Sequence, residues 1–310
     1  MMRSMIPRPL EEVTHGLDPG LSLGPVPRVG VGFFRKLGAI KPRVPMIVTG
    51  AMTSWPAMTS WAPEALKARI GDRRVEVLVH SDGASNRSDC ISVSFREFID
   101  AVVPEVPLHP WHLVVGSIYA QRPPRFLPRR VARYLHRFPT VVFPELERDV
   151  NVELLIEPRT ILEMNFWVAY NGAITKLHFD QTDNLLAIVS GRKKLLLFAP
   201  SQAKNLYREH YLHPNFNFSK VDPENVDVIR FPDSRRAEYW ECILEPGEVL
   251  YIPACYWHHV RSEGFCVSAN VWFNRQYLSE RVIRRAVIFA AYDLGLIPRT
   301  TARASSSDNP

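Results

Sequence analysis

The stretch TKLHFDQTDNLLAIVSGRKKLLLFAP, residues 175–200, decides the fold of this chain. Its apolar runs are short, rich in Leu, Ile and Val, and separated by the turn-forming pair Ser190-Gly191, so they predict strands. From about residue 152 to residue 273 the chain continues as short apolar strands between turns, with no long helical pattern. This succession predicts a mainly β architecture, either a sandwich or a barrel.

The composition excludes several classes of protein. The chain has 310 residues, of which 46% are hydrophobic and 23% charged, which rules out collagen-like, mostly disordered and disulfide-framework chains. The four cysteines show no CxxC spacing, and this favours reduced thiols. The net charge of +6 permits an acidic partner such as nucleic acid without requiring one.

Two further absences in the sequence bear on its location. No stretch reaches the roughly 18 apolar residues that are needed to span a bilayer. The N-terminal sequence MMRSMIPRPLEEV lacks the apolar core of a secretory signal. We therefore expect no membrane contact, and a location in the cytoplasm or the nucleus.

Local signals outside the main β region predict several further elements. Pro63 opens a short helix that Gly71 ends, and Ser94 followed by Glu97 has the spacing of a capping box at a helix start. Strands are expected over three segments: 46–49, 73–80 and 111–120.

We divide the chain into an N-terminal arm (1–40), one main domain (41–275), a C-terminal helical segment (276–298) and a disordered tail (299–310). The helical spacing of apolar residues over 278–297 predicts a helix that covers the barrel or forms a homodimer with a second copy. Six arginines lie between residues 122 and 137. They indicate a solvated helix face, or alternatively a surface that contacts phosphate or an acidic protein.

The residues that carry chemistry begin with His178 and Asp180. Residues two apart in a strand point to the same face, so these two side chains form half of a chelate. A later strand within 247–262 supplies His258 and His259. A lone His-x-Asp pair is more often a satisfied polar pair, but two imidazoles and one carboxylate on one side of an ion form the facial triad of non-haem Fe(II) oxygenases.

A lysine follows from the hairpin expected at Ser190-Gly191. If these two residues form the turn, Lys193 faces Ile188, which shares its parity with His178. Lys193 then points toward the metal and Lys194 points away as a surface lysine. A buried ammonium needs an anionic partner, and near such a metal this indicates a dicarboxylate co-substrate.

A second expected hairpin does not decide which histidine is the third metal ligand. A three-residue turn over 262–264 places His258 and Asn270 on one face, whereas a two-residue turn aligns Asn270 with His259. Gly264 suits the left-handed position that closes a three-residue loop, which favours His258 without deciding the choice.

These residues resemble a known family. HFDQTDNLLAIVSGRKKLLLFAP followed by GEVLYIPACYWHHVRSEGFCVSANVWF is similar to the JmjC/cupin-like Fe(II)- and 2-oxoglutarate-dependent oxygenases, and specifically to their small hydroxylase branch. That branch includes the asparaginyl hydroxylase of hypoxia-inducible factor, JmjC lysyl hydroxylases and the wybutosine tRNA hydroxylase. The resemblance implies a double-stranded β-helix (jelly-roll or cupin) core with flanking helices. The upstream segment KPRVPMIVTGAMTSWPAM is also similar to the family's entry segment.

The resemblance implies a role for eight residues. The histidine five residues after the Pro of the IPA strand is the family's ligand, which selects His258. The implied metal ligands are His178, Asp180 and His258, and the implied 2-oxoglutarate contacts are Tyr119, Thr175, Asn184, Lys193 and Asn270, with Lys193 on the far carboxylate.

The implied function is hydroxylation of a protein side chain by Fe(II) and 2-oxoglutarate. A tRNA- or nucleic-acid-modifying hydroxylase is the alternative, which the net charge and the arginines over 122–137 support. A third reading is a cupin module that binds metal without catalysis. The sequence does not identify the substrate, the hydroxylated atom, the oligomeric state, or hydroxylation as opposed to demethylation.

Overall fold

The fold is known from a computed structural model, which describes residues 9–13, 15–37, 44–79, 90–102, 111–120, 143–170, 172–209 and 216–273. The expected C-terminal helical segment and the arginines over 122–137 lie outside these ranges. Among the described residues, no helix has both the length and the apolar character needed to cross a bilayer.

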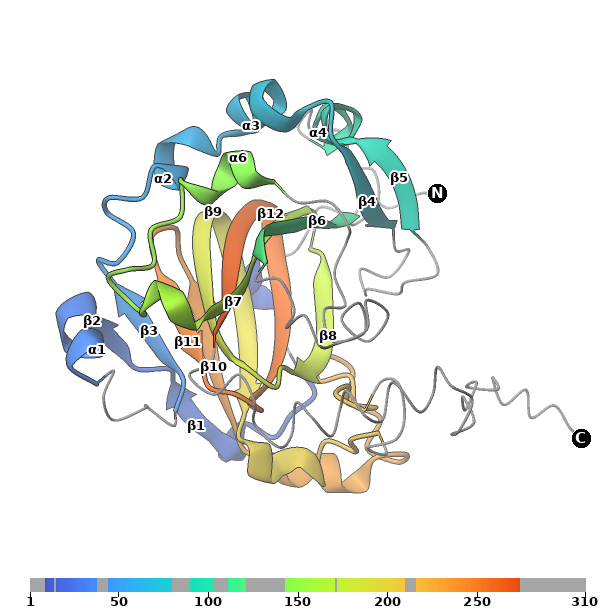
Figure 1. The fold of residues 1–310 in the computed structure, drawn as a ribbon. Coiled ribbons are helices and arrows are strands. Elements are labelled where there is room, and N and C mark those ends of the chain that lie inside the picture. Colours follow the sequence, from blue (N-terminus) through green and yellow to red (C-terminus); the bar gives the residue numbers. More distant parts are fainter. Residues whose placement is uncertain are drawn as a thin grey trace, which may run out of the picture.

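Twelve strands form one strongly curled sheet, so the architecture is mainly β, as expected (Figure 1). The strands are β1 (Ser22–Pro25), β2 (Arg28–Gly30), β3 (Met46–Thr49), β4 (Arg74–Val79), β5 (Cys90–Ser94), β6 (Trp111–Ala120), β7 (Ile161–Tyr170), β8 (Ile174–Phe179), β9 (Asp183–Phe198), β10 (Tyr239–Leu244), β11 (Val249–Ile252) and β12 (Trp257–Phe273). The path through the sheet is β2-β3-β11-β9-β12-β7-β6-β4-β5, with β1, β8 and β10 branching from it.

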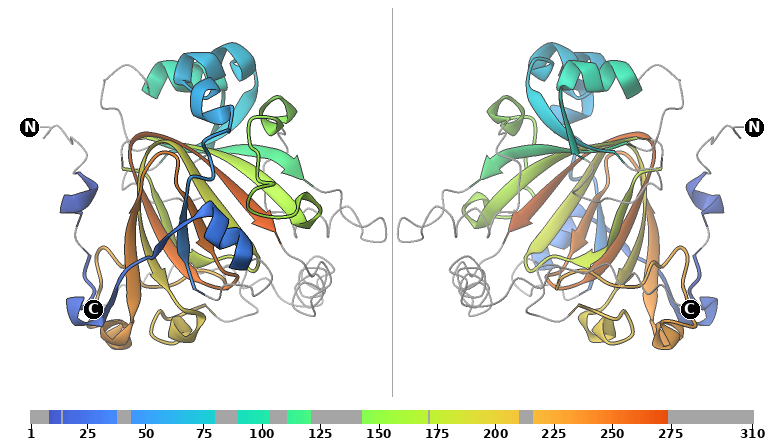
Figure 2. Two further views of the ribbon diagram at one scale, coloured as in Figure 1. Left: turned by 90° about the vertical axis from the view of Figure 1, so that its left-hand side faces the viewer. Right: turned by 90° about the vertical axis from the view of Figure 1, so that its right-hand side faces the viewer.

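The helices gather at one end of the curled sheet, as the side views show (Figure 2). They are α2 (Ala57–Ser60), α3 (Pro63–Ile70), α4 (Phe95–Val102) and α6 (Pro144–Glu147), while α1 (Val31–Leu37) lies beside β2 and β3. Short 3-10 turns complete the chain: η1 (Leu10–Glu12), η2 (Pro19–Leu21), η4 (Pro158–Thr160), η5 (Pro200–Ala203) and η6 (Pro232–Arg236).

The local signals for helix and strand boundaries are confirmed. Pro63 opens α3, and the backbone N–H of Gly71 closes it on the Lys67 carbonyl. At α4 the capping box forms in both directions, because the Glu97 N–H donates to Ser94 Oγ at 3.1 Å and the Ser94 N–H donates to Glu97 Oε2 at 2.7 Å.

Two long strands build the double-stranded β-helix. The first half of β9 pairs with β11 and its second half with β10, while β12 pairs first with β8 and then with β7. β9 and β12 also pair with each other over nearly their whole length. Each strand therefore runs through both halves of the barrel.

This continuity corrects both expected hairpins. Ser190-Gly191 and residues 262–264 are not turns that reverse the chain; they lie inside β9 and β12, where the register shifts between Glu263 and Val267. Gly191 has φ +71°, and a Cβ there would lie 2.6 Å from the Phe265 carbonyl oxygen. The glycine thus permits a bulge in a continuous strand.

The bulge fixes which side chains face the inside of the barrel. Before it, even-numbered residues of β9 such as Leu186 and Ile188 enter the interior cluster, and after it odd-numbered residues such as Leu195 and Leu197 do so. Residues opposite each other in a ladder share a face, and β12 follows the same rule: Val260 faces Leu195. The outer faces pack elsewhere, one against the helices around Trp61 and Phe166 and one around Leu177 and Trp257.

Candidate metal centre

Three side chains with metal-ligand chemistry converge at the mouth of the barrel. His178 lies near the end of β8, Asp180 directly follows β8, and His258 is the facing residue on β12. One ligand atom from each lies within 4.8 Å of the other two. Asp180 Oδ1 is 3.9 Å from His178 Nε2, and Asp180 Oδ2 is 3.7 Å from His258 Nε2.

Backbone carbonyls set the orientation of both imidazoles. Nδ1 of His178 is 2.8 Å from the Lys176 carbonyl oxygen, and Nδ1 of His258 is 3.1 Å from the Tyr256 carbonyl oxygen. In each ring Nδ1 donates, so the lone pair of Nε2 points into the site, which is the arrangement of histidines that ligate metals. Burial, with a further contribution from His178, lowers the pKa of His258 to about 4, so this ring is neutral at pH 7.

Asp180 is held by two donors that leave Oδ1 free of these contacts. Asn184 Nδ2 donates to Asp180 Oδ2 at 3.2 Å, and Trp272 Nε1 donates to the same oxygen at 3.1 Å. Asn184 in turn accepts from Asn270 at 3.2 Å, and Asn270 accepts from Trp167 Nε1. Asn184 and Asn270 thus belong to a chain of hydrogen bonds that orients the carboxylate.

Lys193 lies on the same interior face as His258. It pairs with Ser262, four residues along β12 from His258, and its Nζ donates to Ser262 Oγ at 2.8 Å. Only 5% of Lys193 is exposed. Among the residues that the structure describes, no carboxylate forms an ion pair with it, so the site presents a buried ammonium without an anion.

Lys194 differs from its expected role as a surface lysine. It points to the outer face, but it is 8% exposed and its Nζ lies 3.0 Å from Glu241 Oε1 and 2.7 Å from the Val13 carbonyl oxygen. The N-terminal arm, distant in sequence, covers it. The burial of Lys194 could therefore not be predicted from the residues next to it in the sequence.

Two more interior residues have polar atoms without a partner. Ser268 pairs with Ile188 and Asn165 pairs with Asn270, both side chains are 0% exposed, and Ser268 Oγ and both amide atoms of Asn165 have no hydrogen bond within the described structure. Buried polar groups are normally satisfied, and those that are not are explained by strain, an ordered water or a bound partner. A carboxylate-bearing small molecule beside Lys193 fits this lining.

The remaining expected contacts are placed as follows. Thr175 pairs with Val260 on the interior side, beyond an irregularity that separates it from His178. Tyr119 lies on β6 opposite Met164, and its side chain is outside what the structure describes. The roles of both residues remain predictions.

His259 faces away from the metal centre. Its Nε2 is 2.9 Å from Glu224 Oε1, and Arg261 donates to both oxygens of Glu224. Burial alone would raise the pKa of Glu224, but the hydrogen bonds from Arg261 and His259 outweigh it and lower this pKa to about 2. The ion pair ties the loop around Glu224 to the back of the strand that carries His258.

The sequence analysis missed two aromatic residues of the site. Trp272 is not among the predicted site residues, yet its Nε1 donates to Asp180 Oδ2; its position two residues after Asn270 was a usable signal. Phe218 stacks on His178 with ring centroids 5.5 Å apart. It comes from a loop whose path the local sequence does not indicate.

A double-stranded β-helix that brings two imidazoles and a carboxylate together inside one end of its barrel defines a protein of the cupin type with a potential metal site. Comparison with family models makes this specific: residues 33–279 match the cupin-like domain, and the chain belongs to this JmjC-type family.

Several curated proteins are similar to the chain. It is 30% identical over 244 residues to lysine-specific demethylase 8 of Danio rerio, covering 76% of this chain and 54% of that protein. It is 27% identical over 262 residues to the bifunctional peptidase and (3S)-lysyl hydroxylase JMJD7 of Homo sapiens, covering 76% and 79%. It is also 28% identical over 228 residues to tRNA wybutosine-synthesizing protein 5 of Danio rerio, covering 70% and 65%. The match thus spans only about half of the first of these relatives.

Proposed function

We propose that the chain is an Fe(II)- and 2-oxoglutarate-dependent dioxygenase that hydroxylates a protein side chain. The observation that carries this proposal is the pairing of the His178–Asp180–His258 cluster with a buried, uncompensated Lys193 on the same interior face. A metal-binding module needs the first feature but has no use for the second, because burying an unpaired ammonium is unfavourable.

The residues of the chain fit both groups. The donor set of two neutral imidazoles and one carboxylate suits Fe(II), and it leaves coordination positions open. Lys193 would bind the far carboxylate of 2-oxoglutarate, and Thr175, Asn184, Asn270 and Tyr119 are proposed to line the same pocket. When bound, iron and 2-oxoglutarate supply the oxidation of a C–H bond by O₂, with succinate and CO₂ as co-products.

The protein's own contribution is positioning. The carbonyls of Lys176 and Tyr256 hold both Nε2 atoms toward the metal position. Asn184 and Trp272 both donate hydrogen bonds to Asp180 Oδ2. Because Oδ2 is occupied in this way, Oδ1 is favoured as the metal ligand. Phe218 stacks on the His178 ring, and the apolar interior cluster lines the barrel.

A protein substrate is favoured by the relatives. The name of human JMJD7 describes a lysyl hydroxylase, and the match spans 79% of that protein. Lysine-specific demethylase 8 also carries a name for chemistry on lysine, although the match spans a smaller part of it.

The second candidate is a tRNA-modifying hydroxylase. It is supported by the similarity to tRNA wybutosine-synthesizing protein 5 and by the net charge of +6. Binding to phosphates releases counterions, so this candidate requires RNA binding that weakens steeply with added salt. Failure to bind tRNA at low salt removes it.

Metal content and co-substrate turnover test the proposal. Protein purified and loaded with Fe(II) without oxygen should bind one equivalent of iron and release succinate from 2-oxoglutarate once O₂ is added. His258→Ala should lose both properties, whereas His259→Gln, a change of the adjacent histidine on the opposite face, should keep the iron. Equal iron loss in both variants, or no succinate release with any protein or tRNA extract, contradicts the assignment.

The substrate class can be read from mass spectra. Cells with and without this chain are compared for modifications that add the mass of one oxygen atom, both in proteins and in tRNA nucleosides. A difference confined to proteins supports the proposal, and a difference confined to tRNA replaces it with the second candidate.

A further inference from the structure

The N-terminal arm lies against the outside of the barrel directly behind Lys193. We define the latch as residues 10–13 and 15–17 of this arm. Leu10 is 1% exposed and its N–H donates to Glu263 Oε1 at 3.1 Å. At the other end of the latch Leu17 is buried in the outer cluster, and the Gly16 N–H donates to the Pro223 carbonyl at 2.9 Å. The latch is therefore docked along its length.

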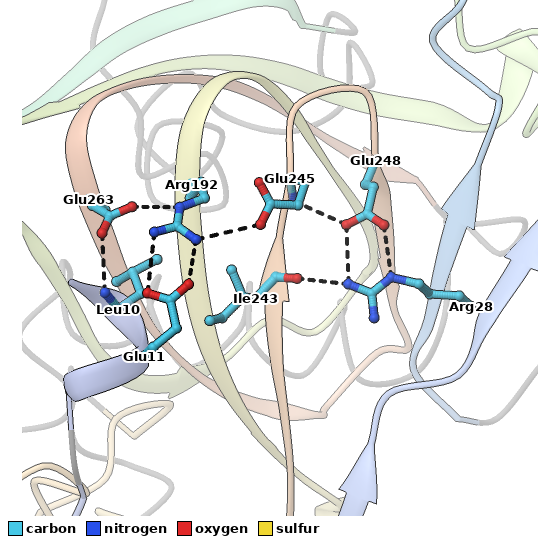
Figure 3. Close-up of polar contacts among 8 residues, drawn as sticks. All are labelled: Leu10, Glu11, Arg28, Arg192, Ile243, Glu245, Glu248 and Glu263. Atoms are coloured by element: carbon cyan, nitrogen blue, oxygen red, sulfur yellow. Dashed lines mark hydrogen bonds and ion pairs between the residues drawn. The ribbon is translucent and has the colours of Figure 1, made fainter.

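Two outward side chains join the latch to β9, and they are the two neighbours of Lys193. Arg192 Nη1 lies 2.5 Å from Glu11 Oε1, and Arg192 Nε lies 2.6 Å from Glu263 Oε2 (Figure 3). Lys194 donates to the Val13 carbonyl at 2.7 Å. Side chains alternate between the faces of a strand, so residues 192 and 194 point out while Lys193 points in.

The regular ladder of β9 is interrupted next to this point. Lys193 follows the bulge at Gly191 by two residues, and the register of β9 with β12 is broken between Ser190 and Arg192. Its pairing with β10 also ends at Lys193, opposite Leu244. Bulges locally disrupt the ladder. Lys193 still pairs with Ser262 on β12 and with Leu244 on β10, but it lies at the edge of the regular ladder, so contacts from outside the barrel add to its positioning.

We propose that the latch is a positioning device for Lys193: Glu11, acting through Arg192, and the Val13 carbonyl, acting through Lys194, fix the backbone on both sides of the lysine from outside the barrel. These residues touch neither the metal position nor the pocket. The inference rests on the proposed function only for the binding of 2-oxoglutarate by Lys193. The effect of the latch on the backbone of β9 does not depend on that function.

The chain contains a matched control for this effect. Arg28 binds Glu248 at 2.8 Å and the Ile243 carbonyl at 3.0 Å, so it also ties the N-terminal region to the barrel surface (Figure 3). It joins β2 to β10 and to Glu248, just before β11, and it contacts neither side chain that flanks Lys193. Arg192 also lies 3.7 Å from Glu245, whose N–H donates to Glu248, but its contacts with Glu11 and Glu263 do not involve Arg28. Arg28→Gln thus removes an ion pair of the same type without releasing the lysine.

The test measures 2-oxoglutarate binding by calorimetry, in full-length protein loaded with Mn(II) in place of iron. Arg192→Gln should weaken binding by about three- to tenfold and Glu11→Gln by less, while Mn(II) affinity stays unchanged. The double variant should bind as Arg192→Gln does, because Glu11 acts through Arg192. Arg28→Gln should bind 2-oxoglutarate like the unaltered protein.

Hydrogen exchange of the peptide over residues 190–196, without metal or 2-oxoglutarate, gives a second measurement. Arg192→Gln should accelerate exchange there, and Arg28→Gln should not. Unchanged binding and exchange in Arg192→Gln, or equal effects of Arg28→Gln, overturn the inference. Faster exchange in a chain whose unaltered form binds no 2-oxoglutarate would instead uphold the latch and reject the proposed function.

Discussion

Replacing Lys193 by Met should stabilise the ligand-free protein. The ammonium is 5% exposed and its hydrogen-bond partner is the neutral Ser262 hydroxyl at 2.8 Å. Withdrawing an ion from water costs several kcal/mol, whereas the charged hydrogen bond that is lost contributes about 1.5–3 kcal/mol. Methionine fills a similar volume without charge. We expect a net gain of about 1–2 kcal/mol in the free energy of unfolding. Each kcal/mol corresponds to a rise of roughly 2–4 °C in Tm.

The adjacent Lys194→Met should have the opposite sign. Its Nζ is 3.0 Å from Glu241 Oε1 and 2.7 Å from the Val13 carbonyl oxygen. Removing it leaves that carbonyl without its donor and leaves the partly buried Glu241 carboxylate with His15 as its partner, which costs about 1–2 kcal/mol. Two neighbouring lysines of similar burial are thus expected to change stability in opposite directions, because only one of them has an anionic partner.

The assay is urea and thermal unfolding with and without 2-oxoglutarate, in the presence of Mn(II). Ligand at 100 times its dissociation constant stabilises by about 2.7 kcal/mol, so the unaltered protein should show a clear shift. Lys193→Met should show no shift, while Lys194→Met should keep one at higher 2-oxoglutarate concentration. If Lys193→Met were destabilised as much as Lys194→Met, or still responded to 2-oxoglutarate like the unaltered protein, the interpretation of Lys193 would be refuted.

Two further predictions concern stability. Gly191→Ala should destabilise the protein by about 2–4 kcal/mol, because φ is +71° and a Cβ would meet the backbone of the facing strand. Gly264→Ala should cost only about 1–2 kcal/mol, because φ is +58° but the space around a Cβ is open. The midpoints of urea unfolding measure both effects. Glu224 has a pKa lowered to about 2, so its stabilisation is present above about pH 4.5 and is lost as the pH falls toward 2. Glu224→Gln should therefore lower stability at pH 7 by about 3 kcal/mol and flatten its loss between pH 5 and pH 3, and an unchanged pH profile would contradict this.

Local signals in the sequence predicted local structure well. The capping box at Ser94 and Glu97, and the Pro63 start of α3, depend on residues within one helical turn, so their chemistry is complete in a short window. The three expected strands outside the main β region are present as β3, β4 and β6 for the same reason.

The bulge in β9 shows where local information fails. A turn and a bulge both accept a glycine with positive φ, so Ser190-Gly191 fits either structure. The difference lies in β12, about 70 residues away, which pairs with β9 on both sides of Gly191. The face of Lys193 was nevertheless predicted, because one extra residue in a bulge changes the parity of the strand as the expected turn would have done.

The polar residues inside the barrel argue against a purely structural role for the fold. Many side chains on the outer faces of β9 and β12 are apolar and pack into the two outer clusters. The interior holds Lys193, which is buried without an anionic partner in the described structure, and also Asn165 and Ser268, whose buried polar atoms have no hydrogen bond there. Their burial is unfavourable in the absence of a ligand. A barrel that served only to hold a metal through His178, Asp180 and His258 would be more stable without them, so they support the proposal of a second, anionic ligand.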